Sequence, residues 1–398
     1  MRQTAYVVNT GIITAIGDDT SSCLDSLVSC KSGISKAEYL ETFWKDTLPV
    51  GEVKRSNQEL AAISGSGKYW PRTALLSAAA VKEAWKPFEK KSTGLRTGFF
   101  SASTNGGMDL TEIFFKTYKK GQHPANLQQV MYHECGAVTE LVSKHFRFSD
   151  FTTTISTACS SSANSIMMAA QMIANNMIDV AVAGGTDGLI RFTLNGFNTL
   201  MILDKQPCQP FDKNRRGLNL GEGAGYIVLA NERALKQLNA APICTVSGYA
   251  NANDAYHQTA SSPEGTGNIL AIQGALNKAG INAADIDYIN LHGTGTENND
   301  SSEGKAIETI FGNNIPMASS TKAFTGHTLG ASGGVEAVFS VLSIQHGVVF
   351  PNLRWETPMD DISWHPTTEL KTGLNIRNVL SNSFGFGGNC SSLIFSKC

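Results

Sequence analysis

The elements expected from this sequence follow the same order twice. Residues 152–155 are β-branched and favour a strand, which runs into a turn of small residues and then a helix with apolar residues at helical spacing. Residues 317–321 lead in the same way into a Gly- and Ser-rich turn and a second apolar helix. This repeated order predicts two similar α/β halves with buried mixed sheets, related by a pseudo-twofold, whose equivalent loops meet near one centre.

The predicted boundary between the halves lies near residues 239–242. We therefore expect an N-terminal half at residues 1–241, which carries the candidate nucleophile, and a C-terminal half at residues 242–398, which carries both candidate histidines. A chain of 398 residues is long enough for two domains or for one large duplicated domain.

Composition and charge exclude several classes of protein. A net charge of −2 gives no reason to expect a nucleic-acid partner. No stretch is apolar for long enough to span a membrane, and the N-terminus does not read as a secretory signal. The 8 cysteines include no CxxC pair, so neither a zinc ribbon nor a disulfide framework is expected. We expect a cytoplasmic enzyme with reduced thiols.

Cys159 lies at the predicted junction between a strand and a helix. The N–H groups of the first helical turn have no partner within the helix, and the helix dipole adds partial positive charge there. Both effects favour the thiolate, which makes Cys159 a candidate nucleophile. An inert, packed cysteine is the alternative at such a junction.

Two histidines, His292 and His327, stand in Gly- and Thr-rich turns at matching places in the repeat. A Cys nucleophile with two histidines suggests acyl transfer, in which backbone N–H groups of Cys159 and Phe386 could stabilise an oxyanion. A histidine N–H could also bind an enolate oxygen made by decarboxylation. A metal site of the same three side chains is the alternative, but their separations lack zinc spacing.

Lys322 and Glu336 lie in the same region of the second half as His327. A Lys–Glu pair there could hold the loop and bias the histidines electrostatically. An ordinary surface pair is the alternative, and such a pair would contribute little to stability.

A series of motifs resembles the elongating β-ketoacyl-acyl-carrier-protein synthases (3-oxoacyl-ACP synthase I/II type) of the thiolase superfamily. The motifs follow the order and approximate spacing of that family and cover essentially the whole chain. They are TACSSS at 157–162, AGGTD at 183–187, PFDKNRRGLNLGEGAG at 210–225, HGTGT at 292–296, SSTKAFTGHTLGASG at 319–333 and NSFGFGG at 382–388. The resemblance implies an α/β thiolase fold, a duplicated five-layered αβαβα arrangement with two mixed sheets.

The resemblance also implies a reaction, a decarboxylative Claisen condensation. An acyl group held on Cys159 would react with malonyl-ACP to give 3-oxoacyl-ACP, CO2 and free ACP, in fatty acid or specialised polyene or polyketide biosynthesis. His292 and His327 would serve decarboxylation, with Lys322 as their electrostatic partner. The remaining implied site residues are Phe386 and Phe384 at the gate and oxyanion hole, and Glu336 and Asp300 in support.

No redox cofactor is implied, because 4'-phosphopantetheine arrives on the carrier protein. A sodium or potassium ion, as some relatives hold, would match Asn290, Ser381 and Glu336. The implied partners are acyl carrier protein and either a second copy or a chain-length-factor-like subunit, with residues 128–137 at the dimer interface. The carrier-protein docking face is basic in this family, and its candidates are Arg72, Lys119, Lys120, Arg215 and Arg216.

Two positions depart from the family pattern. Asn105, assigned with Phe197 to the acyl pocket, replaces an aliphatic residue, and its polar side chain favours a short or incompletely saturated chain from a specialised pathway. Asn389 and Cys390 replace a Thr–Asn pair. Because thiolases use a second Cys as base in a comparable loop, a thiolase acting on acyl-CoA is one alternative. A catalytic subunit that depends on a chain-length-factor partner is the other.

Overall fold

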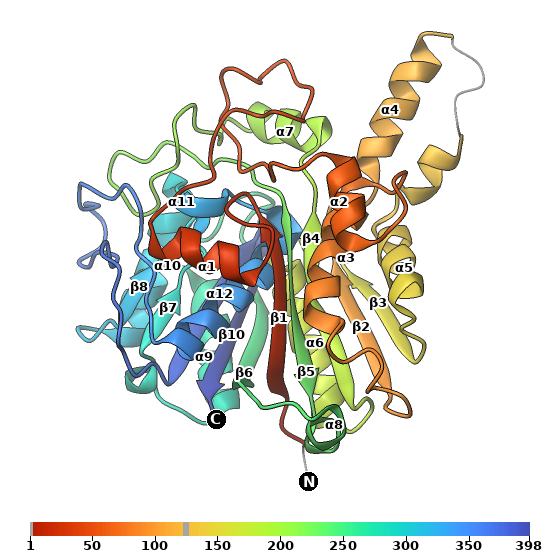
Figure 1. Cartoon of the computed structure of the whole chain (residues 1–398). Coiled ribbons are helices and arrows are strands. Elements are labelled where there is room, and N and C mark those ends of the chain that lie inside the picture. The colour runs from red at the N-terminus through yellow and green to blue at the C-terminus, as the bar shows by residue number, and fades with distance from the viewer. Residues whose placement is uncertain (1–2, 122–126) are drawn as a thin grey trace.

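The computed structural model describes residues 3–121 and 127–398. Its strands form one mixed sheet of 10 strands, in which each half of the chain contributes strands in the same relative order (Figure 1). The order in the first half is β3 (Phe151–Ile155), β2 (Thr97–Ala102), β4 (Val180–Asp187), β5 (Gly223–Ala230) and β1 (Tyr6–Thr14). The equivalent order in the second half is β8 (Met317–Ser319), β7 (Tyr288–Asn290), β9 (Asn378–Gly385), β10 (Asn389–Lys397) and β6 (Cys244–Asn253).

The pairing directions repeat as well. β2 is parallel to β3 and β4, as β7 is parallel to β8 and β9, and the remaining pairs within each half are antiparallel. The two predicted sheets are joined where β1 meets β6 through the pairs of Tyr6 with Thr245 and Val7 with Cys244. The repeat expected from the sequence is therefore present in the topology, with a short bridge that the sequence did not indicate.

Helices α6 (Ser161–Ala174) and α12 (Ser332–His346) form the middle layer between the two halves of the sheet. Both are apolar nearly all round, as a helix covered on every side must be. Helix α3 (Arg72–Trp85) covers the outer face of the first half, and α9 (Thr266–Ala279) covers that of the second. The predicted five-layered fold is thus confirmed.

The other helices of the described residues lie around these layers. They are α1 (Thr20–Val28), α2 (Asn57–Ser64), α4 (Met108–Lys119), α5 (Cys135–Phe146), α7 (Arg191–Thr199), α8 (Glu232–Leu238), α10 (Glu297–Phe311) and α11 (Lys322–Thr325), with 3-10 turns η1 (Leu127–Tyr132), η2 (Ala283–Asp285), η3 (Leu329–Ala331) and η4 (Phe386–Gly388). No helix in this part of the chain has both the length and the apolar character that a membrane crossing requires.

One face of the first half is left without a partner. Helix α4 has no buried residue and projects away from the sheet (Figure 1), with the apolar side chains of Ile113, Phe115 and Tyr118 exposed. Among the described residues, strand β3 lies at the edge of the sheet and pairs only with β2. An unpaired edge and exposed apolar groups are features that proteins usually cover.

Candidate active site

Cys159 lies in the turn between β3 and α6, as the sequence predicted. The turn is tight, because Ala158 adopts a positive φ of 52° and the N–H of Thr157 donates to the Ser161 hydroxyl over 2.8 Å. The Cys159 side chain is buried, at 6% exposure, and lines a cavity of about 350 Å³. The strand-to-helix turn therefore places one sulfur at the inner end of a cavity.

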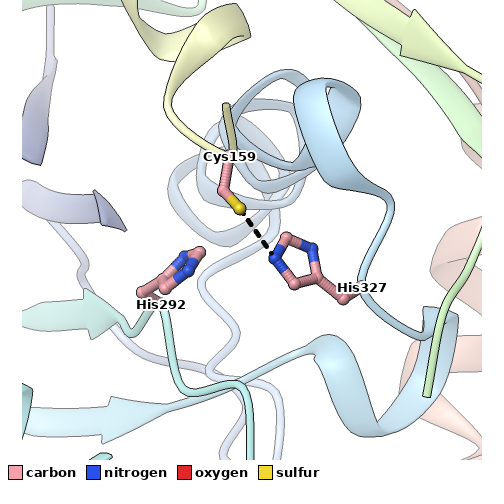
Figure 2. Close-up of side chains that lie close together, drawn as sticks. All are labelled: Cys159, His292 and His327. Carbon is pink, nitrogen blue, oxygen red and sulfur yellow. Dashed lines mark hydrogen bonds between the residues drawn. The ribbon is translucent and has the colours of Figure 1, made fainter. Parts of the chain in front are cut away.

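The two histidines face this sulfur (Figure 2). His327 Nε2 lies 3.1 Å from Cys159 Sγ, and the two imidazole rings are 5.4 Å apart between centroids. The N–H of Leu329 donates to His327 Nδ1 over 3.1 Å. A neutral His327 that accepts at Nδ1 carries its proton on Nε2, directed at the sulfur.

Lys322 sets the same tautomer in His292. Its ammonium lies 3.2 Å from His292 Nδ1 and also donates to the His292 carbonyl and to the Glu336 carboxylate. The ammonium has only donors, so His292 Nδ1 accepts and Nε2 carries the proton. Lys322 and Glu336 are each 2% exposed, so the predicted pair forms and it is not a surface pair.

Burial controls the ionisation of this group. Burial and the Lys322 charge together hold the pKa of both imidazoles well below the ordinary value, so both are neutral. Burial raises the pKa of Cys159 to about 11, against the opposing effects of the Lys322 charge and the Phe386 N–H. The expectation that the helix N-terminus would favour a resting thiolate was wrong, because desolvation outweighs it.

A second turn supplies N–H donors beside the sulfur. The Phe386 N–H points to Cys159, and Gly385 packs so closely that a Cβ there would lie 3.1 Å from the Cys159 nitrogen. The structure therefore brings together the two N–H groups that the sequence named as candidates for an oxyanion hole. The Phe386 ring stacks on Phe197 at 5.8 Å, and Phe384 lies 6.1 Å from the His292 ring. All three aromatic rings line the cavity.

Two acids of α10 hold the His292 loop. Asp300 accepts the N–H groups of Phe211 and Gly295, so it joins two loops without touching either imidazole. Glu303 accepts the N–H groups of His292 and Gly293 at 2.9 and 2.8 Å. Sequence reasoning missed Glu303, although a second acid one helical turn after Asp300 could have indicated a buried face. Burial raises the pKa of Glu303 to about 7.

Several buried polar atoms in segments next to the site residues have no hydrogen-bond partner among the described residues. They are both side-chain polar atoms of Asn290, one oxygen of Glu336 and the hydroxyl of Ser383. Ser381, also buried, is the direct cross-strand neighbour of Asn290. Carboxylate, amide and hydroxyl oxygens are hard ligands that suit an alkali cation, so Asn290, Glu336 and Ser381 fit the ion suggested from the sequence.

Asn105 and Cys390, the two departures from the family pattern, lie away from the cavity. The Asn105 amide donates to the Gly188 carbonyl over 2.8 Å and accepts from the Thr193 hydroxyl over 3.0 Å. Its assignment to the acyl pocket stays a prediction. The Cys390 thiol donates to Asn268 over 3.2 Å, and burial raises its pKa to about 12. Neither residue lines the cavity that contains Cys159.

Two of the basic docking candidates are buried. Arg72 forms a salt bridge with Glu222, and Arg215 donates to the backbone carbonyls of Thr296 and Glu297, where α10 begins. Neither can present its charge to a partner protein, so these two candidates were wrong. Lys119, Lys120 and Arg216 are exposed.

The metal alternative has support from distance alone. The ligand atoms of Cys159, His292 and His327 lie within 4.8 Å of one another, which is close enough for one ion. The distances alone therefore allow either a metal site or an acyl-transfer site.

Comparison with known proteins places the chain in a family. Residues 5–234 match the N-terminal domain of beta-ketoacyl synthases, and residues 243–356 match the C-terminal domain. The chain is 32% identical to 3-oxoacyl-[acyl-carrier-protein] synthase 2 of Staphylococcus aureus, over 100% of this chain and 99% of that protein. It is also 32% identical to the chloroplastic synthase II of Arabidopsis thaliana, over 98% of this chain and 75% of that protein.

Comparison with solved structures gives the same result as comparison of the sequences. A ketosynthase in complex with its chain length factor from Xenorhabdus doucetiae superimposes with a TM-score of 0.87 at 30% identity, over 100% of this chain and 98% of that one. The ishigamide ketosynthase/chain length factor gives a TM-score of 0.91 at 25% identity, with both chains fully covered. These matches extend over the whole described fold and include the loops that carry Cys159, His292 and His327. The chain belongs to the β-ketoacyl synthase family.

Proposed function

We propose that this protein condenses an acyl group held on Cys159 with malonyl-ACP, releasing CO2 and forming 3-oxoacyl-ACP. The observation that carries the proposal is the convergence of one thiol and two neutral imidazoles at the buried end of one cavity. Family membership supports it, because the curated relatives are 3-oxoacyl-ACP synthases.

The first half-reaction transfers the acyl group. The Cys159 sulfur attacks the thioester carbonyl of acyl-ACP, the bond to the carrier sulfur breaks, and the thiol proton passes to the departing carrier thiolate. The N–H groups of Cys159 and Phe386 stabilise the tetrahedral oxyanion. Since the resting thiol is protonated, these donors must act as negative charge develops during the attack.

The second half-reaction forms the carbon–carbon bond. The Nε2–H groups of His292 and His327 donate to the thioester oxygen of malonyl-ACP, so that loss of CO2 leaves a stabilised enolate. The enolate carbon attacks the acyl carbonyl on Cys159, and the bond to Cys159 breaks to leave a thiolate, which takes up one proton from solvent. Lys322 keeps the His292 tautomer that this step requires.

The unpartnered oxygens of Asn290 and Glu336, together with the buried hydroxyl of the neighbouring Ser381, suit a sodium or potassium ion. Such an ion would supply a fixed positive charge beside Glu336 and would keep the Lys322 loop in place. The active-site residues need no other cofactor of their own for the reaction proposed, since phosphopantetheine arrives on the substrate.

We propose that the uncovered face formed by β3 and α4 is covered by a second subunit. The exposed apolar side chains of α4 and the unpaired edge of β3 support an association that buries apolar surface. That subunit is a second copy of this chain or, as in the ketosynthase from Xenorhabdus doucetiae, a chain length factor. Purification from the source cells followed by intact mass would distinguish one kind of chain from two. A cytoplasmic location stays a prediction.

A thiolase acting on acyl-CoA is the second candidate, and the position of Cys390 away from the cavity disfavours it. The test is intact mass spectrometry of the wild type and Cys159→Ala after incubation with acyl-ACP, followed by malonyl-ACP. An adduct on Cys159 that is converted to 3-oxoacyl-ACP with release of CO2 would support the condensing role. An adduct with acyl-CoA but with no acyl-ACP would refute it and favour the thiolase reaction.

A further inference from the structure

The cavity that holds Cys159 has a buried end and an exposed end. Cys159, His292 and Phe384 are buried at one end, whereas Met201 and Arg216 are largely exposed at the other. A thioester that reaches Cys159 must therefore enter past the exposed residues. Whatever group joins the thioester arm to its carrier protein stays at that outer end.

Arg216 gives the outer end of the cavity a fixed positive charge. Among the described residues that line the cavity it is the single Lys or Arg, and its side chain is 64% exposed. Its guanidinium makes one long contact, 3.5 Å, with Asp204, so most of its five N–H donors are open to a ligand. The Asp204 carboxylate offsets part of this charge, and Glu297 is the single carboxylate among the described residues of the cavity lining.

The backbone on both sides of Arg216 is fixed. Arg215 is buried and donates to the carbonyls of Asp212, Thr296 and Glu297. On the other side, the Gly217 N–H donates to the Gly295 carbonyl over 3.0 Å, and a Cβ on Gly217 would lie only 2.4 Å from a backbone oxygen of Ile202. The loop therefore presents the Arg216 side chain to the cavity mouth from a rigid base, which lowers the entropy lost on binding.

We infer that Arg216 binds the phosphodiester that links the pantetheine arm to the carrier protein. The inference rests on the proposed function, because it assigns a contact of the same substrate. Arginine presents a planar fork of donors that matches phosphate oxygens, and a charge-assisted contact of this kind is stronger than a neutral one. The acidic surface of the carrier protein is the other source of negative charge, and the test separates the two.

The experiment measures the rate of Cys159 acylation in single-turnover mass spectrometry with three donors: acyl-ACP, acyl-phosphopantetheine and acyl-pantetheine. Arg216→Ala should lower kcat/KM by roughly threefold to tenfold for the two donors with a phosphate and leave acyl-pantetheine unchanged. Arg216→Lys keeps the charge but not the planar fork of donors, so its kcat/KM should lie between those of the wild type and Arg216→Ala. Lys213→Ala is the matched control, because this nearby cation pairs with Asp360 and does not line the cavity.

Each outcome decides the inference. A loss for acyl-ACP alone would mean that Arg216 contacts the carrier protein, and an equal loss for all three donors would mean a general effect on the site. Either result, or no loss at all, would overturn phosphate recognition. If the wild type forms no adduct with any donor, the proposed function itself fails and this inference fails with it. If the wild type forms a normal adduct and one of the contrary results is found, only the inference about Arg216 fails.

Discussion

Gly385 lies in the turn of Phe386 and packs directly against the turn of Cys159. Replacing it with alanine therefore tests the geometry of the two proposed oxyanion donors. Its backbone, at φ −98° and ψ 155°, suits any residue, so the substitution brings no conformational strain of its own. The added methyl would lie 3.1 Å from the Cys159 nitrogen and from the Thr157 carbonyl oxygen, and 3.3 Å from the Ser160 nitrogen. These contacts are tight, so one of the turns must move by a few tenths of an ångström.

Two consequences follow from that movement. Overpacking of this kind costs about 1–3 kcal/mol in the free energy of unfolding. Loss of one oxyanion donor costs roughly a hundredfold or more in rate, and small misplacements of reacting groups are also expensive. We therefore expect Gly385→Ala to fold and to acylate Cys159 roughly tenfold to a hundredfold more slowly.

Gly387→Ala is the matched control. Gly387 lies in the same turn at φ 78°, with nothing within 4 Å of an added Cβ. Alanine there costs about 1–2 kcal/mol through backbone strain without pressing on Cys159. Both variants are compared in thermal unfolding and in single-turnover acylation by acyl-ACP. The reasoning is refuted if Gly385→Ala acylates at the wild-type rate, or if both variants slow equally at equal loss of stability.

The remaining predictions concern charge and protonation. Lys322→Met leaves the Glu336 carboxyl buried without its partner, so we expect the free energy of unfolding in urea to fall by about 3–5 kcal/mol. We also expect the rate of malonyl-ACP decarboxylation to fall more than the rate of Cys159 acylation. Equal falls in the two rates would contradict a specific role for the His292 tautomer. Because the pKa of Cys159 is raised to about 11, alkylation by iodoacetamide should rise about tenfold per pH unit from pH 7 to 9, and a plateau below pH 8 would contradict a buried neutral thiol. Glu303 has a folded pKa of about 7 against an ordinary value of 4.5, so between these two pH values the folded state binds more protons and stability falls as pH rises. Glu303→Gln should reduce the slope of unfolding free energy against pH by up to about 1.4 kcal/mol per pH unit. An unchanged slope would show that Glu303 does not titrate in this range. Cys390→Ser should keep the acylation rate, since its thiol contacts Asn268 rather than the cavity, whereas loss of activity without loss of stability would revive the thiolase alternative.

The sequence by itself determined the repeated fold and the centre of the site. Strand, turn and helix are local properties, and the period of apolar residues shows which faces are buried, so the repeat could be inferred before the structure. The candidate site followed from the same repeat, because equivalent loops of two similar halves meet. Cys159, His292 and His327 were named on that ground and lie together.

Only the tertiary structure decided the environment of each side chain. Three expectations changed because segments distant in sequence surround the residues concerned. They are the thiolate state of Cys159, the exposure of Arg72 and Arg215, and the separation of the two sheets. Glu303 was missed for the same reason, since its partners are backbone N–H groups of another loop. Desolvation and hydrogen bonding depend on the packing of the whole chain, and residue type with local spacing carries little information about either.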